Sequence, residues 1–143
     1  MTASEVFSIA NFMAMPMWVL MIFLPKWKVT SWLMKFKVIP LLLAIVYAIY
    51  IVITLLEGPA MNFGSLEAVM ELFKDERALL AGWVHYLAFD LLVGMWMLDQ
   101  NKKLGIHQII MAPILLATFM LGPVGFILFM ALRAVKKQSN EES

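Results

Sequence analysis

The sequence contains no cysteine among its 143 residues and few charged residues, and both shortages exclude classes of function. Without thiols the chain can form no disulfide, thiolate metal site, iron–sulfur cluster or cysteine nucleophile. Charged residues make up only 15% of the chain and the formal net charge is +1. Such a balance does not provide the basic surface that nucleic-acid binding requires, so we expect no nucleic-acid partner.

The first residues of the sequence do not show the pattern of a targeting leader. The N-terminal residues, MTASEVFSIAN, place no basic residue before the first apolar run and form no long Arg- and Ser-rich stretch. This composition predicts neither a cleaved secretory signal nor an organelle transit peptide. We therefore expect the first apolar segment to remain in the mature protein, and a bacterial cytoplasmic membrane is the simplest location.

Hydrophobic residues, by contrast, are abundant. They make up 63% of the chain, and the mean hydropathy is +0.86, well above the roughly 45–50% apolar content of soluble domains. Four apolar segments of about 20 residues are each long enough to cross the hydrocarbon core of a bilayer. They cover residues 6–24, 38–56, 78–98 and 108–132. The sequence predicts one all-α domain over residues 1–143, an integral membrane four-helix bundle whose immediate partner is the lipid bilayer.

The connecting segments predict how the bundle meets the membrane surface. Lysines alternate with Trp and Phe over residues 26–37, which is typical of an interfacial loop. Ser65 is placed to cap a short amphipathic helix that lies on the membrane between spans two and three. Residues 134–143 are charged and are expected to be disordered. With four spans, the basic residues divide six against five between the two sides, and the first loop favours both termini outside the cytoplasm.

The third predicted span carries two ionisable side chains, His85 and Asp90. Ionisable groups are costly in hydrocarbon and usually face a partner or a cavity. Because the two residues lie about 140° apart around a helix, a direct pair is not expected, and each requires a partner from another helix. The helical rise places Tyr86 and several further polar residues in the same half of the bilayer. The residues expected to complete one pocket are Asn11, Tyr47, Tyr50, Trp83, Phe89, Gly94 and Thr118.

These residues are suited to proton transfer. A neutral histidine is a competent general base, and a carboxyl group in a low-dielectric pocket favours its protonated form and can donate a proton. Together they would suit isomerisation or epoxide opening on a lipophilic molecule. The alternative is that His85 and Asp90 are hydrogen-bonding contacts between helices. His107 lies at the opposite end of the bundle, so we expect neither a metal site nor a cofactor.

Three segments resemble one known family. They are LLAGWVHYLAFDLLVGMWMLD over residues 79–99, FSIAN over residues 7–11 and TFMLGPVGFILF over residues 118–129. This pattern is similar to the abscisic-acid-deficient-four-like membrane family, which includes plant plastid proteins required for neoxanthin synthesis. The resemblance covers nearly the whole chain, and its most specific part is the block from Trp83 to Gly94.

The resemblance implies a role connected with carotenoids. In the plant members, the epoxide of violaxanthin becomes the allenic alcohol of neoxanthin, which requires loss of a carbon-bound proton and protonation of the epoxide oxygen. For this chain, the resemblance implies that His85 accepts a proton and that Asp90, with Tyr86, supplies one. Since we expect no transit peptide here, unlike in the plant members, we do not carry violaxanthin over as the substrate and expect a carotenoid, isoprenoid or other lipophilic molecule. A non-catalytic protein that binds a pigment or lipid, or scaffolds a partner, is the alternative, and homo-oligomerisation is left open.

Overall fold

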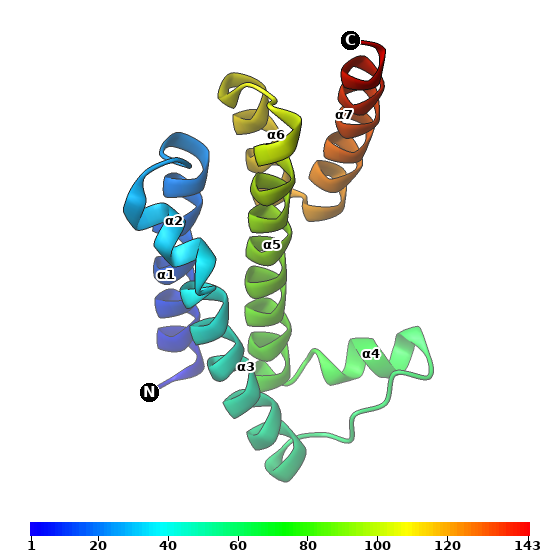
Figure 1. Ribbon diagram of the computed structural model, residues 1–143. Coiled ribbons are helices and arrows are strands. Elements are labelled where there is room, and N and C mark those ends of the chain that lie inside the picture. The colour runs from blue at the N-terminus through cyan, green and yellow to red at the C-terminus, as the bar shows by residue number, and fades with distance from the viewer. The chain divides into compact units, whose positions relative to one another are not determined.

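The computed structural model describes residues 1–143 and contains seven α-helices and no strand (Figure 1). The helices are α1 (Ala3–Phe23), α2 (Lys28–Lys35), α3 (Val38–Glu57), α4 (Leu66–Leu72), α5 (Glu76–Leu104), α6 (Gln108–Met120) and α7 (Gly122–Glu142). The all-α prediction is confirmed. Three helices, α1, α3 and α5, are long and apolar enough to cross a membrane, whereas α6 is apolar but shorter.

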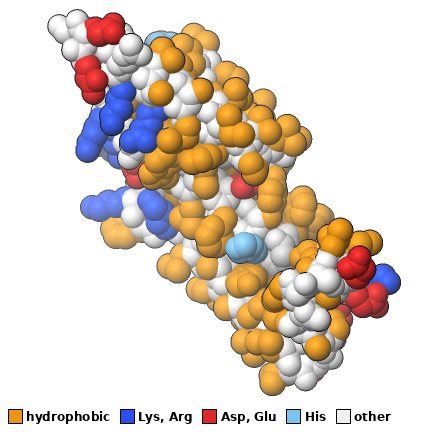
Figure 2. Space-filling view, turned by 90° about the vertical axis from the view of Figure 1, so that its right-hand side faces the viewer, with side chains coloured by type: hydrophobic (Ala, Val, Ile, Leu, Met, Phe, Trp, Pro, Cys, Tyr) orange, Lys and Arg blue, Asp and Glu red, His pale blue; other side chains and the backbone are white.

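The surface of the long helices is apolar. On α3, Ile45, Ile49 and Val52 are each about half exposed, at 51%, 52% and 51%. Hydrophobic side chains also cover much of the face shown in Figure 2. So large an exposed apolar surface is unfavourable in water, whereas it is well solvated by lipid tails. This surface supports membrane association.

The chain divides into two compact units, which we describe separately. Unit 1 comprises Met1–Ala14 and Ile39–Phe89, and unit 2 comprises Met15–Val38 and Asp90–Ser143. Helices α1 and α5 each contribute residues to both units.

In unit 1, the connection between α3 and α5 contains α4, the short helix that the sequence predicts. The hydroxyl oxygen of Ser65 accepts a hydrogen bond of 3.1 Å from the backbone N–H of Ala68, so the predicted N-cap is confirmed. At the far end of the connection, the Arg77 guanidinium contacts the Glu57 carboxylate at 2.9 Å. This ion pair holds the start of α5 beside the end of α3.

Asp75 begins α5. Its Oδ1 accepts hydrogen bonds of 3.0 Å from the backbone N–H groups of both Ala78 and Arg77. The bond from Ala78 contributes most to holding the pKa of the Asp75 carboxyl below its ordinary value; Arg77 adds to this effect and partial burial opposes it. Because Asp75 satisfies two of the free N–H groups of the first turn, α5 starts cleanly and extends over 29 residues.

In unit 2, the lysine-rich segment after α1 is more regular than expected. Residues 26–37 are predicted as an interfacial loop, but Lys28–Lys35 form helix α2. The helix ends where Lys37 adopts a φ of 51°, the left-handed conformation that favours glycine. The Lys37 ammonium donates a 2.7 Å hydrogen bond to the carbonyl oxygen of Met34, which stabilises this helix end.

The predicted fourth span, residues 108–132, is not one helix. It breaks at Leu121, where φ is −141° and ψ is 64°, and α7 turns back beside α6 in unit 2 (Figure 1). Pro123, at the start of α7, suits a helix beginning because it needs no backbone N–H partner there. Gly125 packs so closely on Thr118 that a Cβ atom would overlap the Thr118 backbone. The prediction of a continuous fourth span is therefore corrected to a helical hairpin.

The C-terminal residues also differ from the prediction. Residues 134–143 are expected to be disordered, but α7 continues to Glu142. The side chain of Gln138 donates a 3.2 Å hydrogen bond to the Glu142 carboxylate one turn later. Contacts with this spacing give modest support to an exposed helix.

Close packing in unit 2 makes Gly94 a sensitive position. A Cβ atom there would lie 2.8 Å from Met21 Cε and 2.9 Å from Trp18 Cη2, and Trp18 is buried. We predict that Gly94→Val lowers the free energy of unfolding by about 1–3 kcal/mol, because the side chains around it must move. Denaturant unfolding in detergent micelles measures the change. The control Ala44→Val, at an exposed position of α3, should change stability little. Equal losses of unfolding free energy in the two variants would contradict close packing at Gly94.

Candidate functional site

Asn11 joins α1 to α5 within unit 1. Its side-chain oxygen accepts a hydrogen bond of 3.1 Å from the indole N–H of Trp83, and its amide N–H donates at 2.8 Å to the carbonyl oxygen of Phe7. The rings of Phe7 and Trp83 also pack with their centroids 5.5 Å apart. Both sides of the Asn11 amide are therefore bonded, which is how a polar side chain is accommodated in an apolar span.

Two aromatic rings contact His85. The ring centroid of Tyr47, on α3, lies 5.5 Å from that of the imidazole, and the ring of Phe89, one turn later on α5, lies 4.6 Å away. We find no hydrogen bond to an imidazole nitrogen among the contacts of unit 1. His85 and Phe89 are exposed, and Tyr47 is half-buried. The imidazole is thus held by ring contacts while the residue remains exposed.

Trp83 stands between two other rings. Besides Phe7, it contacts Tyr86, with ring centroids 5.5 Å apart and planes inclined at 31°. Tyr50, which the sequence assigns to the same pocket, is half-buried on α3, and its carbonyl oxygen accepts a 2.8 Å hydrogen bond from the Thr54 hydroxyl. The structure therefore connects Tyr86 with Trp83 and Tyr47 with His85.

Unit 1 also contains an apolar cavity beside Trp83. Its volume is about 270 Å³. The lining residues are Ala3, Ser4, Phe7, Glu76, Leu79, Leu80 and Trp83. Since this lining is mainly apolar, the cavity suits a hydrophobic group more than a polar ligand.

The remaining predicted site residues lie in unit 2. Asp90 is next to Gly122, where a Cβ atom would lie 2.5 Å from the Asp90 carboxylate. The Thr118 hydroxyl is buried, donates at 2.8 Å to the carbonyl oxygen of Ile114 and lies 3.5 Å from Met97 Sδ. Gly94 is covered by protein side chains. Thr118 and Gly94 are therefore occupied by contacts that hold unit 2 together.

His85 and Asp90 belong to different units. The pocket that the sequence predicts between them remains a prediction. What the structure adds is the set of neighbours that each residue has within its own unit.

The prediction from the sequence missed two features of unit 2. The side-chain amide of Gln108 donates to the carbonyl oxygens of Ile22, at 3.2 Å, and Phe23, at 2.8 Å, and so caps the end of α1. A cavity of about 710 Å³ lies close to this contact and is lined by lysines from separate segments. No local sequence pattern pairs residue 108 with residue 22. The sequence pattern of the lysines predicted anchoring at the membrane surface, and it did not predict a pocket.

Comparison with known families identifies the chain. A family model described as ABA DEFICIENT 4-like matches residues 5–129. The chain belongs to this family. The resemblance predicted from the sequence is therefore confirmed, and the matched range of the ABA4-like family includes His85, Tyr86 and Asp90. No curated protein and no solved structure matches the chain.

The Asn11–Trp83 hydrogen bond gives a test of the helix contact in unit 1. We predict that Asn11→Leu and Trp83→Phe are not additive, with a coupling of about 1 kcal/mol, because each substitution removes the same bond. Denaturant unfolding of the two single variants and the double variant measures this coupling. Trp83→Phe keeps an aromatic ring, so ring packing is preserved in the comparison. If the losses of unfolding free energy in the two single variants add up to the loss in the double variant, the hydrogen bond contributes nothing to stability.

Proposed function

We propose that this ABA4-like protein is a multi-pass membrane enzyme that isomerises a lipophilic substrate, such as a carotenoid epoxide, by acid–base chemistry. The observation that carries the proposal is the environment of His85. Its imidazole is accessible, is held by the rings of Tyr47 and Phe89, and has no hydrogen bond to its nitrogens in unit 1. A general base needs this combination of fixed orientation and an available nitrogen.

The surroundings of His85 suit an apolar, unsaturated substrate. Phe89 and Trp83 are 57% and 39% exposed, so their rings are available for contact. Flat conjugated chains pack favourably against aromatic rings. A substrate dissolved in the bilayer would reach such a surface laterally and would not have to pass through water.

In the proposed reaction, a His85 nitrogen removes a proton from a carbon atom near the epoxide. The electron pair of that C–H bond forms a new C=C bond while a C–O bond of the epoxide breaks. The epoxide oxygen then takes a proton from Asp90, with Tyr86 as a neighbouring donor. The substrate loses one proton and gains one, so the product is an isomer, and later transfer of the proton from His85 to Asp90 restores the protein.

A second candidate function is binding without chemistry. The apolar cavity of about 270 Å³ beside Trp83 favours it, because such a space could hold part of a pigment or lipid. In this case the protein would retain a lipophilic molecule unchanged or present it to a partner.

The catalytic proposal is tested by expressing variants in a host that makes carotenoid epoxides and measuring products by chromatography. We predict that His85→Ala and Asp90→Asn each lower product formation at least about 100-fold, the range typical of a lost general base or acid. Tyr86→Phe should have a smaller effect.

The control for this experiment is Ser8→Ala, which removes an exposed polar group of α1 that bonds only to the carbonyl oxygen of Ser4. It should leave product formation unchanged. All variants are compared at equal membrane content and thermal stability. Full activity of both His85→Ala and Asp90→Asn would rule out the catalytic assignment, and binding of unaltered pigment would then favour the second candidate.

We also propose a topology in a cell membrane with the N-terminus outside and the C-terminus in the cytoplasm. Helix α6 has 13 residues, or about 20 Å, which is shorter than the roughly 30 Å hydrocarbon core. Since α7 turns back beside α6, the C-terminus falls on the side where α6 begins. Nine of the 11 basic residues then share that side: Lys26, Lys28, Lys35, Lys37, Lys102, Lys103, Arg133, Lys136 and Lys137. Basic segments that flank spans stay preferentially in the cytoplasm.

The absence of cysteine makes this topology directly testable. We predict that a single cysteine in place of Asn62 reacts with a membrane-impermeant maleimide in intact bacterial cells. Cysteines in place of Lys103 and Ser139 should react only after the cells are permeabilised. Labelling of the residue 139 position in intact cells would show instead that the C-terminus lies outside, as a continuous fourth span requires.

A further inference from the structure

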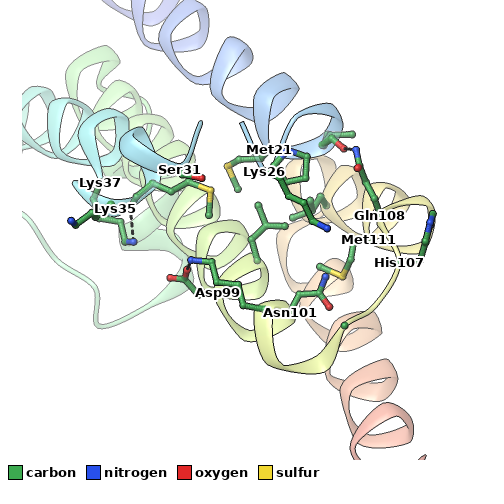
Figure 3. Close-up of a pocket in the computed structure, with 17 residues that line it drawn as sticks. Met21, Lys26, Ser31, Lys35, Lys37, Asp99, Asn101, His107, Gln108 and Met111 are labelled. Atoms are coloured by element: carbon green, nitrogen blue, oxygen red, sulfur yellow. Dashed lines mark hydrogen bonds and ion pairs between the residues drawn. The ribbon is translucent and has the colours of Figure 1, made fainter. Parts of the chain in front are cut away.

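We propose that unit 2 binds the phosphate headgroup of an anionic amphiphile in a basic pocket. The lining of this site does not include His85, and the proposal does not depend on the function proposed for that residue. The basic pocket is the cavity of about 710 Å³ formed by the C-terminal end of α1, helix α2, the C-terminal end of α5 and the start of α6 (Figure 3).

The lining of the basic pocket carries an excess of positive charge. Four lysines, Lys26, Lys35, Lys37 and Lys102, line it, and Asp99 is its one carboxylate, which leaves three net positive charges with histidine neutral. Lys102 contacts Asp99 at 2.9 Å, but both side chains are exposed, so this pair is weak. An anionic ligand would therefore relieve repulsion among the lysines.

Part of the lining is apolar and buried, beside polar residues such as Ser31 and Asn101. Met21, Met34, Leu98, Met111 and Leu115 line the pocket and are each less than 9% exposed. Lys26, Lys35 and Lys102, in contrast, are exposed. The pocket therefore combines exposed cationic groups with a buried apolar surface, and this combination matches a molecule that has both an anionic head and a hydrocarbon part.

Two further features suit a ligand at the level of the lipid headgroups. The first residue of α6, Gln108, lines the pocket, so the positive end of this helix dipole adds to the field of the lysines. Trp27, Trp32 and Phe36, in and around α2, are 50%, 56% and 55% exposed. Exposed aromatic rings with neighbouring lysines are typical of the bilayer interface.

Phosphate is the anion that best fits several lysines at once. Its charge is spread over several oxygen atoms, and flexible ammonium groups can approach these from different directions. The phosphate could belong to a membrane lipid or to a water-soluble compound. The buried apolar lining favours the lipid, because a soluble phosphate would leave that surface unused.

The probe for this proposal is phosphatidylglycerol, with phosphatidylcholine as the zwitterionic comparison. Binding of each lipid to the full-length protein in detergent is measured by native mass spectrometry. We predict preferential retention of phosphatidylglycerol, and a loss of affinity of about 30-fold in the double variant Lys35→Ala/Lys102→Ala, since each basic group near a membrane surface contributes about fivefold.

The matched control is Lys28→Ala/Lys103→Ala, which removes the same charge from exposed lysines outside the pocket lining. It should retain nearly full affinity. Ser31→Glu, which adds a negative charge to the pocket without removing a lysine, provides a second variant if the first does not fold, and it should also weaken binding. Equal losses in the two double variants would overturn the proposal, since they would show a general charge effect.

Competition with inorganic phosphate distinguishes the two sources of the headgroup. We predict that millimolar phosphate displaces phosphatidylglycerol poorly, because it gains nothing from the apolar lining. A short-chain phosphatidylglycerol serves as the reference competitor. If inorganic phosphate displaced bound phosphatidylglycerol at the same concentration as this competitor, the pocket would be a site for soluble phosphate, and the amphiphile assignment would be overturned. Equal retention of phosphatidylcholine would overturn the role of the lysines.

Discussion

The structure depends on the requirement that polar groups in hydrocarbon find partners within the protein. Asn11 meets it through Trp83 and the carbonyl of Phe7, and Thr118 meets it through the carbonyl of Ile114. Gln108 satisfies the last carbonyls of α1. Of these bonds, the one from Trp83 to Asn11 and those from Gln108 join two different helices, whereas the other two lie within one helix. His85 differs from these residues because its contacts are with aromatic rings. This difference is the reason for proposing that His85 contacts a bound molecule.

Small residues set how closely the helices of unit 2 approach. Gly94 leaves room for Trp18 and Met21, and Gly125 permits the contact with Thr118 at the hairpin. In the topology proposed above, the hairpin returns the basic end of α7 to the side where α6 begins. A continuous helix over the same residues would separate these charges. In that topology, the close contact of Gly125 with Thr118 at one turn decides on which side the basic end of α7 lies.

Much of the fold follows from local sequence. Long, mainly apolar runs predict α1, α3 and α5, and the Ser65 cap predicts α4, because these signals act over one or a few turns. The hairpin could not be predicted, since Gly-Pro within an apolar run is compatible with a kink as well as a reversal. The contact of Tyr47 with His85 agrees with the expected position of both residues in the same half of the bilayer. The basic pocket, in contrast, joins residues 21–37 to residues 98–115 and has no local signal.

The central claim is that the accessible His85 surface receives a lipophilic molecule from the bilayer. The most direct measurement is to purify the protein from membranes rich in carotenoid epoxides and identify the bound molecules by absorbance and mass spectrometry. The account predicts a carotenoid or another lipophilic molecule in a near-stoichiometric amount, and its loss when Phe89 is replaced by a small residue. Purified protein that carries only bulk phospholipid would contradict the claim.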